Sequence, residues 1–228
     1  GSINNLGGLL LDKGDLAAAE TLYREALEVK RETLGNRHPC TLISISNLGL
    51  LLQAKGDLAA AELQFREALE GRRETRGNRH PDTLVAINNL GMLLKAKGRA
   101  MHIYAAELLF REAVEVSRET LGNRHPDTLM SIGNLGSLLQ DKGDPTAAEP
   151  LLRETLEGER ETLGNRHPST IISINKLGTL LKAKGCMYAA ELLFREAVEA
   201  SRETLGNQHP ETLFAIKNLA CCAAEGQE

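Results

Sequence analysis

The chain has 228 residues, of which 42% are hydrophobic and 25% are charged, a composition typical of globular rather than disordered proteins. It contains 3 Tyr, 4 Phe and no Trp, so a single thick core, which depends on large rings to fill its volume, is not expected. With 27 basic and 31 acidic residues, the formal charge is −4, which leaves no basic surplus to neutralise phosphates. Nucleic acid is therefore excluded as an expected partner.

The sequence also carries no sign of a membrane or secretory protein. No apolar stretch approaches the roughly 20 residues that a membrane-spanning helix needs, and the first residues lack the basic and apolar regions of a signal peptide. The four cysteines match no metal-site spacing, so we expect free thiols in a reducing compartment. These observations predict a cytoplasmic protein with no membrane partner, no metal and no cofactor.

A pentapeptide repeats along the chain. Gly-Asn-Arg-His-Pro begins at positions 35, 77, 122 and 164 and returns as Gly-Asn-Gln-His-Pro at 206. Self-similarity at this period indicates a stack of identical supersecondary units. The expected repeats span 3–34, with a shortened first helix, then 39–76, 81–121, 126–163 and 168–205, and a final helix without a partner spans 210–225.

Each repeat contains two predicted helices, illustrated here by the second repeat. In its first half, Leu42, Ile45 and Leu48 recur at helical spacing, and a helix is expected between Pro39 and Gly56. Proline suits a first helical position, and glycine can turn left-handed after the last one.

The second half of the same repeat predicts another helix, which Asp57 can cap and in which Ala61, Phe65 and Ala68 keep helical spacing. Two antiparallel helices cannot bury their apolar faces alone, so each pair must stack on the next. The sequence therefore predicts an all-α fold, a right-handed α-solenoid of antiparallel helix pairs with about 11 helices.

The third repeat departs from this pattern by three extra residues between Gly98 and Glu107. We expect a longer turn there, whose Met101, His102 and Ile103 offer a second contact at the edge of the solenoid. The alternative is an insertion tolerated on the surface without a role.

Nothing in the repeat points to catalysis. Each histidine of the pentapeptide lies a full repeat from the next, so these side chains cannot share a metal, and a role at helix starts is expected. The Arg-Glu pairs of the second helices are interpreted as a solvated face with weak ion pairs. No nucleophile, phosphate loop or paired-carboxylate pattern stands out, so the chain is not expected to be an enzyme.

The residues at these positions resemble a known family. Leu48, Gly49 and Leu52, followed by Ala61, Phe65 and Ala68, resemble the tetratricopeptide repeat. The 42-residue period and the His-Pro-Asp-Thr sequence resemble the kinesin light chain type of that repeat. The resemblance implies a superhelix whose concave groove binds an extended peptide of a partner protein.

One row of polar residues falls on the expected concave face of the first helices. An asparagine amide both donates and accepts hydrogen bonds, so such a row could hold a peptide backbone without reading its sequence, as the resemblance to kinesin light chain implies. Two alternatives stay open: the side chains occupy ordinary surface positions, or they bond across to a neighbouring helix and hold the repeat spacing. The row consists of Asn5, Asn47, Asn89, Asn134, Lys176 and Asn218.

Three further rows vary between repeats and could give specificity. Two are largely apolar and would form shallow pockets for alternate peptide side chains, at Ile43, Val85, Met130 and Ile172, and at Leu50 and Met92. The third makes part of the groove mildly basic, which favours an acidic peptide, unless the lysines are simply solvated. It consists of Gln53, Lys95, Gln140 and Lys182.

The leading hypothesis from the sequence is a non-catalytic adaptor that binds an extended, acidic peptide segment. The alternative is an architectural or regulatory array of a larger protein that self-associates or packs on its own chain.

Overall fold

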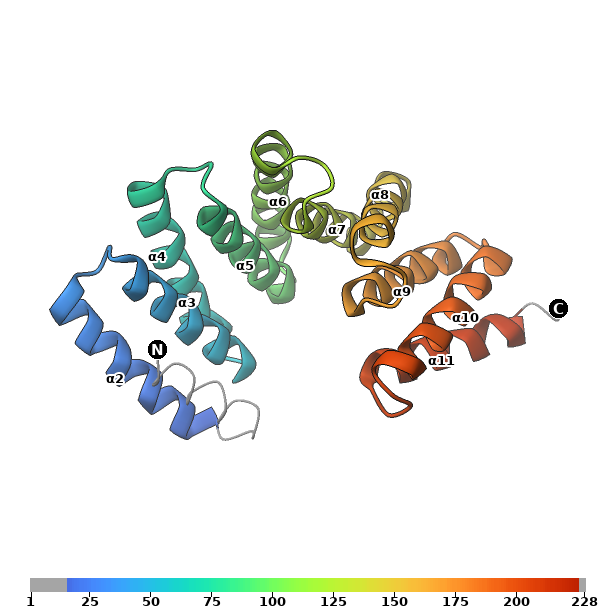
Figure 1. Cartoon of the computed structure of the whole chain (residues 1–228), viewed down its shortest axis with the longest axis horizontal. Coiled ribbons are helices and arrows are strands. Elements are labelled where there is room, and N and C mark those ends of the chain that lie inside the picture. The colour runs from blue at the N-terminus through green and yellow to red at the C-terminus, as the bar shows by residue number, and fades with distance from the viewer. Residues whose placement is uncertain (1–15, 226–228) are drawn as a thin grey trace. The chain divides into compact units, whose positions relative to one another are not determined.

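The computed structural model describes residues 16–225, and every regular element in that range is an α-helix. The chain divides into two compact units, residues 1–120 and 121–228, which are treated separately below. Within each unit, helices that follow one another in the chain pack side by side (Figure 1). The predicted all-α solenoid of antiparallel helix pairs is confirmed, whereas the first predicted helix lies outside the described residues.

The first unit contains five of the described helices, and α3 packs between α2 and α4 just as α4 packs between α3 and α5. Their bounds are α2 (Leu16–Leu34), α3 (Pro39–Ala54), α4 (Leu58–Arg76), α5 (Pro81–Lys97) and α6 (Ala100–Leu121), the last of which ends at the boundary of the unit.

The second unit repeats this order with five more helices, in which α8 packs against both α7 and α9 and α10 packs against both α9 and α11. Their bounds are α7 (Pro126–Asp141), α8 (Pro145–Leu163), α9 (Pro168–Ala183), α10 (Met187–Thr204) and α11 (Pro210–Glu225).

The repeated pentapeptide makes the connection between consecutive helix pairs. Gly77 ends α4 with a φ of 81°, a conformation that only glycine adopts without strain. The Nδ1 atom of His80 accepts a hydrogen bond from the backbone N–H of Asp82 at 3.1 Å, which caps α5, and Pro81 takes the first helical position. The same cap recurs at His38, His125, His167 and His209. The expected role of the histidines at helix starts is therefore confirmed.

Small residues allow the two helices of a pair to approach closely. Gly49 of α3 faces the ring of Phe65 on α4, and a Cβ atom at this glycine would lie 2.8 Å from the ring carbon Cε1. Both residues are buried, together with Ala61 and Ala68 on the same face of α4. Because the ring fills the space over the glycine, one aromatic residue per pair is enough to build this core.

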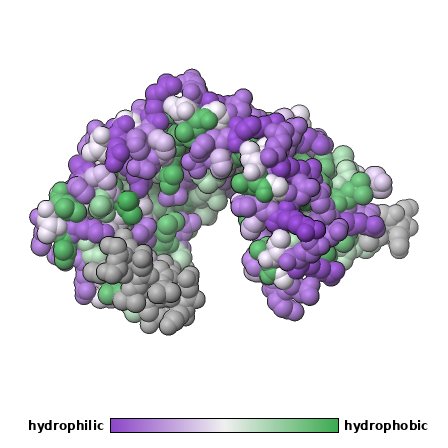
Figure 2. Space-filling model, viewed as in Figure 1, coloured by the Kyte–Doolittle hydropathy of each residue, from purple (hydrophilic) through white to green (hydrophobic). Residues whose placement is uncertain are grey.

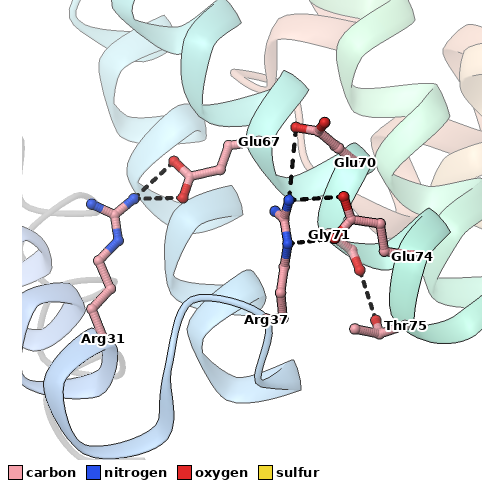
Figure 3. A network of polar contacts seen from close by, with 7 residues as sticks. All are labelled: Arg31, Arg37, Glu67, Glu70, Gly71, Glu74 and Thr75. Carbon is pink, nitrogen blue, oxygen red and sulfur yellow. Dashed lines mark hydrogen bonds and ion pairs between the residues drawn. The ribbon is translucent and has the colours of Figure 1, made fainter.

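Ion pairs join the second helices of consecutive repeats. Arg31 on α2 donates from Nη2 to both carboxylate oxygens of Glu67 on α4, at 2.7 and 2.8 Å (Figure 3). The pentapeptide arginine Arg37 contacts Glu74 at 2.6 Å and Glu70 at 3.9 Å on the same helix. The charged rows of these helices therefore form bridges between repeats in addition to the expected pairs within one helix.

The three-residue insertion of the third repeat lengthens a helix, which corrects the expectation of a longer turn. Helix α6 has 22 residues where α4 has 19, and only Gly98 and Arg99 separate it from α5. Met101, His102 and Ile103 consequently form the first turn of α6. The inserted residues include no helix breaker after Arg99, so the extra length continues the helix.

Candidate functional site

Large apolar side chains lie exposed on the first helix of each described repeat, at the positions predicted to form peptide pockets. We call these side chains the apolar row. Figure 2 shows that, on the face it draws, hydrophobic side chains form separate small areas bordered by hydrophilic ones. Burying an apolar side chain of this size contributes about 1.5–3 kcal/mol, so such a row is a source of binding energy. Its members are Ile43 (α3), Val85 (α5), Met130 (α7), Ile172 (α9) and Phe214 (α11), with Leu50 and Met92 exposed further along α3 and α5.

The predicted asparagines lie beside the apolar row. Asn47 on α3 and Asn89 on α5 are half-buried, and across residues 16–225 no hydrogen bond engages either side chain. Asn134 on α7 is 9% exposed, and Asn218 on α11 donates from Nδ2 to the carbonyl of Phe214 at 3.0 Å. Asn5, the first member of the predicted row, lies outside the described residues.

The bond across to a neighbouring helix that was considered for the asparagine row occurs one position earlier. Asn175 on α9 is buried and donates from Nδ2 to Oε2 of Glu211 on α11 at 3.0 Å. Its neighbour in the row, Lys176, is half-buried on the surface of α9. On α9, therefore, Asn175 contacts the neighbouring helix, whereas Lys176 at the next position lies at the surface.

A cavity of about 270 Å³ opens between α7 and α9, with α8 as its floor. Four predicted residues line it, namely Met130 and Asn134 from α7 and Ile172 and Lys176 from α9. The structure therefore brings members of the apolar row and of the asparagine row together around one hollow in the second unit.

The floor of this cavity holds an acidic residue that sequence reasoning missed. Glu159 of α8 is 7% exposed, and its Oε2 atom has no hydrogen-bond partner among the described residues. Burial raises the pKa of Glu159 above its usual range, while a hydrogen bond with the Ser173 side chain and the nearby charges of Lys176 and His167 act in the opposite direction. The site thus contains a buried carboxylate with one oxygen unused.

The first unit carries the opposite charge at the equivalent place. Arg72 of α4 is 8% exposed, and within residues 16–225 its Nη1 atom has no hydrogen-bond partner. Burial lowers the pKa of Arg72, and the Asp82 carboxylate on α5 acts against that shift. This residue was also missed, because the sequence analysis interpreted only the Arg-Glu pairs of the second helices, and Arg72 belongs to none of them.

The remaining predicted residues are less closely grouped. The basic row of Gln53, Lys95, Gln140 and Lys182 is half-buried along α3, α5, α7 and α9. In the first turn of α6, Met101 is 78% exposed, whereas His102 and Ile103 are half-buried.

A second cavity of about 540 Å³ lies between α8 and α10, lined mainly by leucines of α8, α9 and α10. It is larger than the α7–α9 cavity but contains none of the predicted residues, and Arg153 and Arg160 at its rim are paired with Glu149 and Glu196.

Two classes of site can be assessed over the described residues. None of the helices α2 to α11 is long and apolar enough to cross a membrane. Within residues 16–225, no three His, Cys, Asp or Glu side chains come together in an arrangement that could hold a metal ion.

Comparison with protein families identifies the tetratricopeptide repeat. One model of this repeat matches residues 1–74 and 104–161, and another matches residues 170–211. No curated protein sequence matches the chain.

Solved structures share the fold. A Podosopora anserina protein with kinesin light chain nearly identical TPR-like repeats is 25% identical over 89% of this chain and 95% of its own, with a TM-score of 0.72. A single-substitution variant of that protein is 24% identical over 90% and 95%, with a TM-score of 0.75. BtubC (BKLC) from P. vanneervenii is 20% identical over 94% and 84%, with a TM-score of 0.74. The apo form of RapI is 16% identical over 98% and 82%, also with a TM-score of 0.74.

Proposed function

This chain belongs to the tetratricopeptide repeat family, and we propose that it is a non-catalytic, kinesin light chain-like adaptor that binds an extended peptide segment of a partner protein. The candidate binding surfaces, one in each unit, are the exposed faces of α3 and α5 in the first unit and of α7 and α9 in the second.

The observation that carries this proposal is the apolar row beside asparagines with unused amides. Ile43 and Val85 are exposed where their helices could have carried polar residues, and Asn47 and Asn89 lie one turn away on the same helices. An extended peptide presents alternate side chains and a backbone with paired donors and acceptors, which suit the apolar row and the amides respectively.

Two finer parts of the proposal are that the peptide is acidic, which rests on charge, and that the compartment is cytoplasmic, which rests on the cysteines. Lys95 in the first unit and Lys182 in the second favour acidic peptide residues near them, an effect mainly on association rate and salt dependence. Cys40 and Cys186 are free, exposed thiols, which supports a reducing, cytoplasmic compartment.

A peptide-display selection on the purified chain tests the proposal. Enriched peptides are then measured against the triple variant Asn47→Ala, Asn89→Ala, Asn134→Ala, which we expect to keep its helicity and to bind at least about tenfold more weakly. The matched control changes three exposed loop asparagines, Asn36, Asn78 and Asn123, to alanine. Equal affinity of both triple variants would refute the asparagine row, and no enrichment at all would refute the peptide-binding function.

The second candidate function is an architectural array that self-associates. Leu213 and Phe214 are exposed on α11, which supports a contact between copies at that helix. Sedimentation of the chain over a range of concentrations distinguishes this candidate, since it requires assembly that Leu213→Ser weakens and that peptides do not affect.

A further inference from the structure

The position of Glu159 is occupied by very different side chains in the five second helices. On α6 and α10 it is a serine, and each hydroxyl donates to a carbonyl of its own helix, from Ser117 to Val114 at 3.2 Å and from Ser201 to Val198 at 3.3 Å. A small, locally satisfied residue is therefore sufficient for packing here. The full row is Lys30, Arg72, Ser117, Glu159 and Ser201.

A charge at this position needs a reason, because burying an ion without a partner is costly. Lys30 has a partner, since its ammonium donates to the Ser44 hydroxyl at 2.5 Å. Glu159 is the more buried residue, and its Oε2 atom is left without any hydrogen bond among the described residues. That oxygen belongs to a side chain in the lining of the α7–α9 cavity.

The charges and apolar side chains that line the cavity indicate what kind of group would pair with the Glu159 carboxylate. Asp127 adds a second negative charge to the lining and Lys176 one positive charge, so with Glu159 the cavity is net negative. Met130 and Ile172 supply apolar walls against which the methylene stem of a long side chain can pack.

We propose that the α7–α9 cavity receives a positively charged arginine or lysine side chain of the bound peptide, which pairs with the carboxylate of Glu159. The inference rests on the proposed function, because it assigns one side chain of that peptide. The proposed peptide then carries one basic residue, in addition to the residues that contact the apolar row and the lysines.

The experiment compares peptides enriched on the full chain with versions in which the basic residue is replaced. Arginine is exchanged for citrulline, which keeps the shape and loses the charge. We expect citrulline to weaken binding about tenfold or more to the wild-type chain and less than about twofold to Glu159→Gln. Glu157→Gln is the matched control, because it removes the same charge from an exposed position of α8.

A charge reversal gives an independent readout. Glu159→Arg places in α8 the residue type that α4 buries at the equivalent position. It should select peptides with an acidic residue in place of the basic one. If a variant loses helicity, Glu159→Ser, which copies α6 and α10, replaces it.

The outcomes separate the two proposals. Two results would overturn this inference and leave the proposed function standing, provided that the enriched peptides depend on the asparagines. In the first, the enriched peptides lack a basic residue. In the second, exchange of arginine for citrulline weakens binding equally to the wild-type chain and to Glu159→Gln. If no peptide is enriched, N-acetyl-arginine methylamide is titrated while the Glu159 carboxyl carbon is followed by NMR. A shift that the citrulline analogue does not produce supports the cationic pocket, and no shift overturns it.

Discussion

Gly91 of α5 packs directly against the ring of Phe110 on α6. A Cβ atom at Gly91 would lie 2.6 Å from Cε1 of the ring, closer than real Cβ atoms come, and Phe110 is fully buried. Replacing a helical glycine by alanine gains about 1 kcal/mol of helix propensity, but overpacking a core costs about 1–3 kcal/mol. We expect Gly91→Ala to lower the free energy of unfolding by up to about 2 kcal/mol in urea titrations.

The control for this prediction comes from the fourth repeat. Gly136 of α7 faces Leu152, where the nearest side-chain atoms would lie 3.0 Å from an added Cβ. A leucine can rotate away more easily than a ring, so Gly136→Ala should change stability by less than about 1 kcal/mol. Adding Phe110→Leu to Gly91→Ala should recover part of the loss. Equal effects of the two alanine substitutions would show that the ring contact is not the cause.

The histidine caps predict a second measurable effect. His80 uses Nδ1 to accept the N–H of Asp82 at 3.1 Å, so His80→Ala leaves a helix N-terminus without that acceptor. The loss should be about 1 kcal/mol in the free energy of unfolding. Asparagine is among the best capping residues, so His80→Asn should restore most of it. A loss of the same size for asparagine would instead assign the effect to the packing of the imidazole.

The helix ends could be predicted from the sequence because they depend on local chemistry. The left-handed Gly77, the capping His80 and the helix-starting Pro81 act within a few residues of one another, and each repeat copies them. The solenoid followed from the same residues, since a helix pair with one apolar face must stack. The exposed apolar row could also be predicted, because a helix with a known buried face fixes the direction of its other side chains.

Glu159 could not be predicted in the same way. Its burial depends on α7 and α9, which belong to different repeats, and an arginine or glutamate in an Arg-Glu-rich helix looks like any solvated charge. A signal was nevertheless present, since the row from Lys30 to Ser201 changes charge between otherwise similar repeats. The position of Met101 in the first turn of α6 was not predicted. Comparison of the repeats gives the length of the insertion, but it does not show whether the extra residues lengthen the turn or the helix.

Acid should weaken the contacts between repeats. Glu62 of α4 accepts hydrogen bonds from Lys97 at the end of α5, at 2.5 Å, and from Arg66. Burial alone would raise the pKa of Glu62, but these bonds and charges outweigh it and lower the pKa below its usual 4.5. A lowered pKa contributes stability above pH 4.5 that is lost as the pH falls through the folded-state value.

Glu62→Gln should therefore destabilise the chain by up to about 1 kcal/mol at pH 7 and progressively less as the pH is lowered below about 4.5. Thermal unfolding across this range measures the difference. Glu115→Gln, an exposed position of α6, is the control and should show little difference at any pH. A Glu62→Gln penalty that persists unchanged in acid would mean that the amide disturbs packing.

Glu159 should show the opposite pH dependence. Its pKa is raised above 4.5, so between that value and the folded-state pKa the native chain binds more protons than the unfolded chain. Stability from this group is then complete below pH 4.5 and is lost as the pH rises through the folded-state pKa. The charges that face it are Asp127 of α7 and Lys176 of α9, with His167 just before α9. Since glutamine is neutral throughout, Glu159→Gln should raise the urea midpoint at about pH 7 and leave it unchanged at about pH 4. The same rise at both values would assign the effect to shape rather than charge.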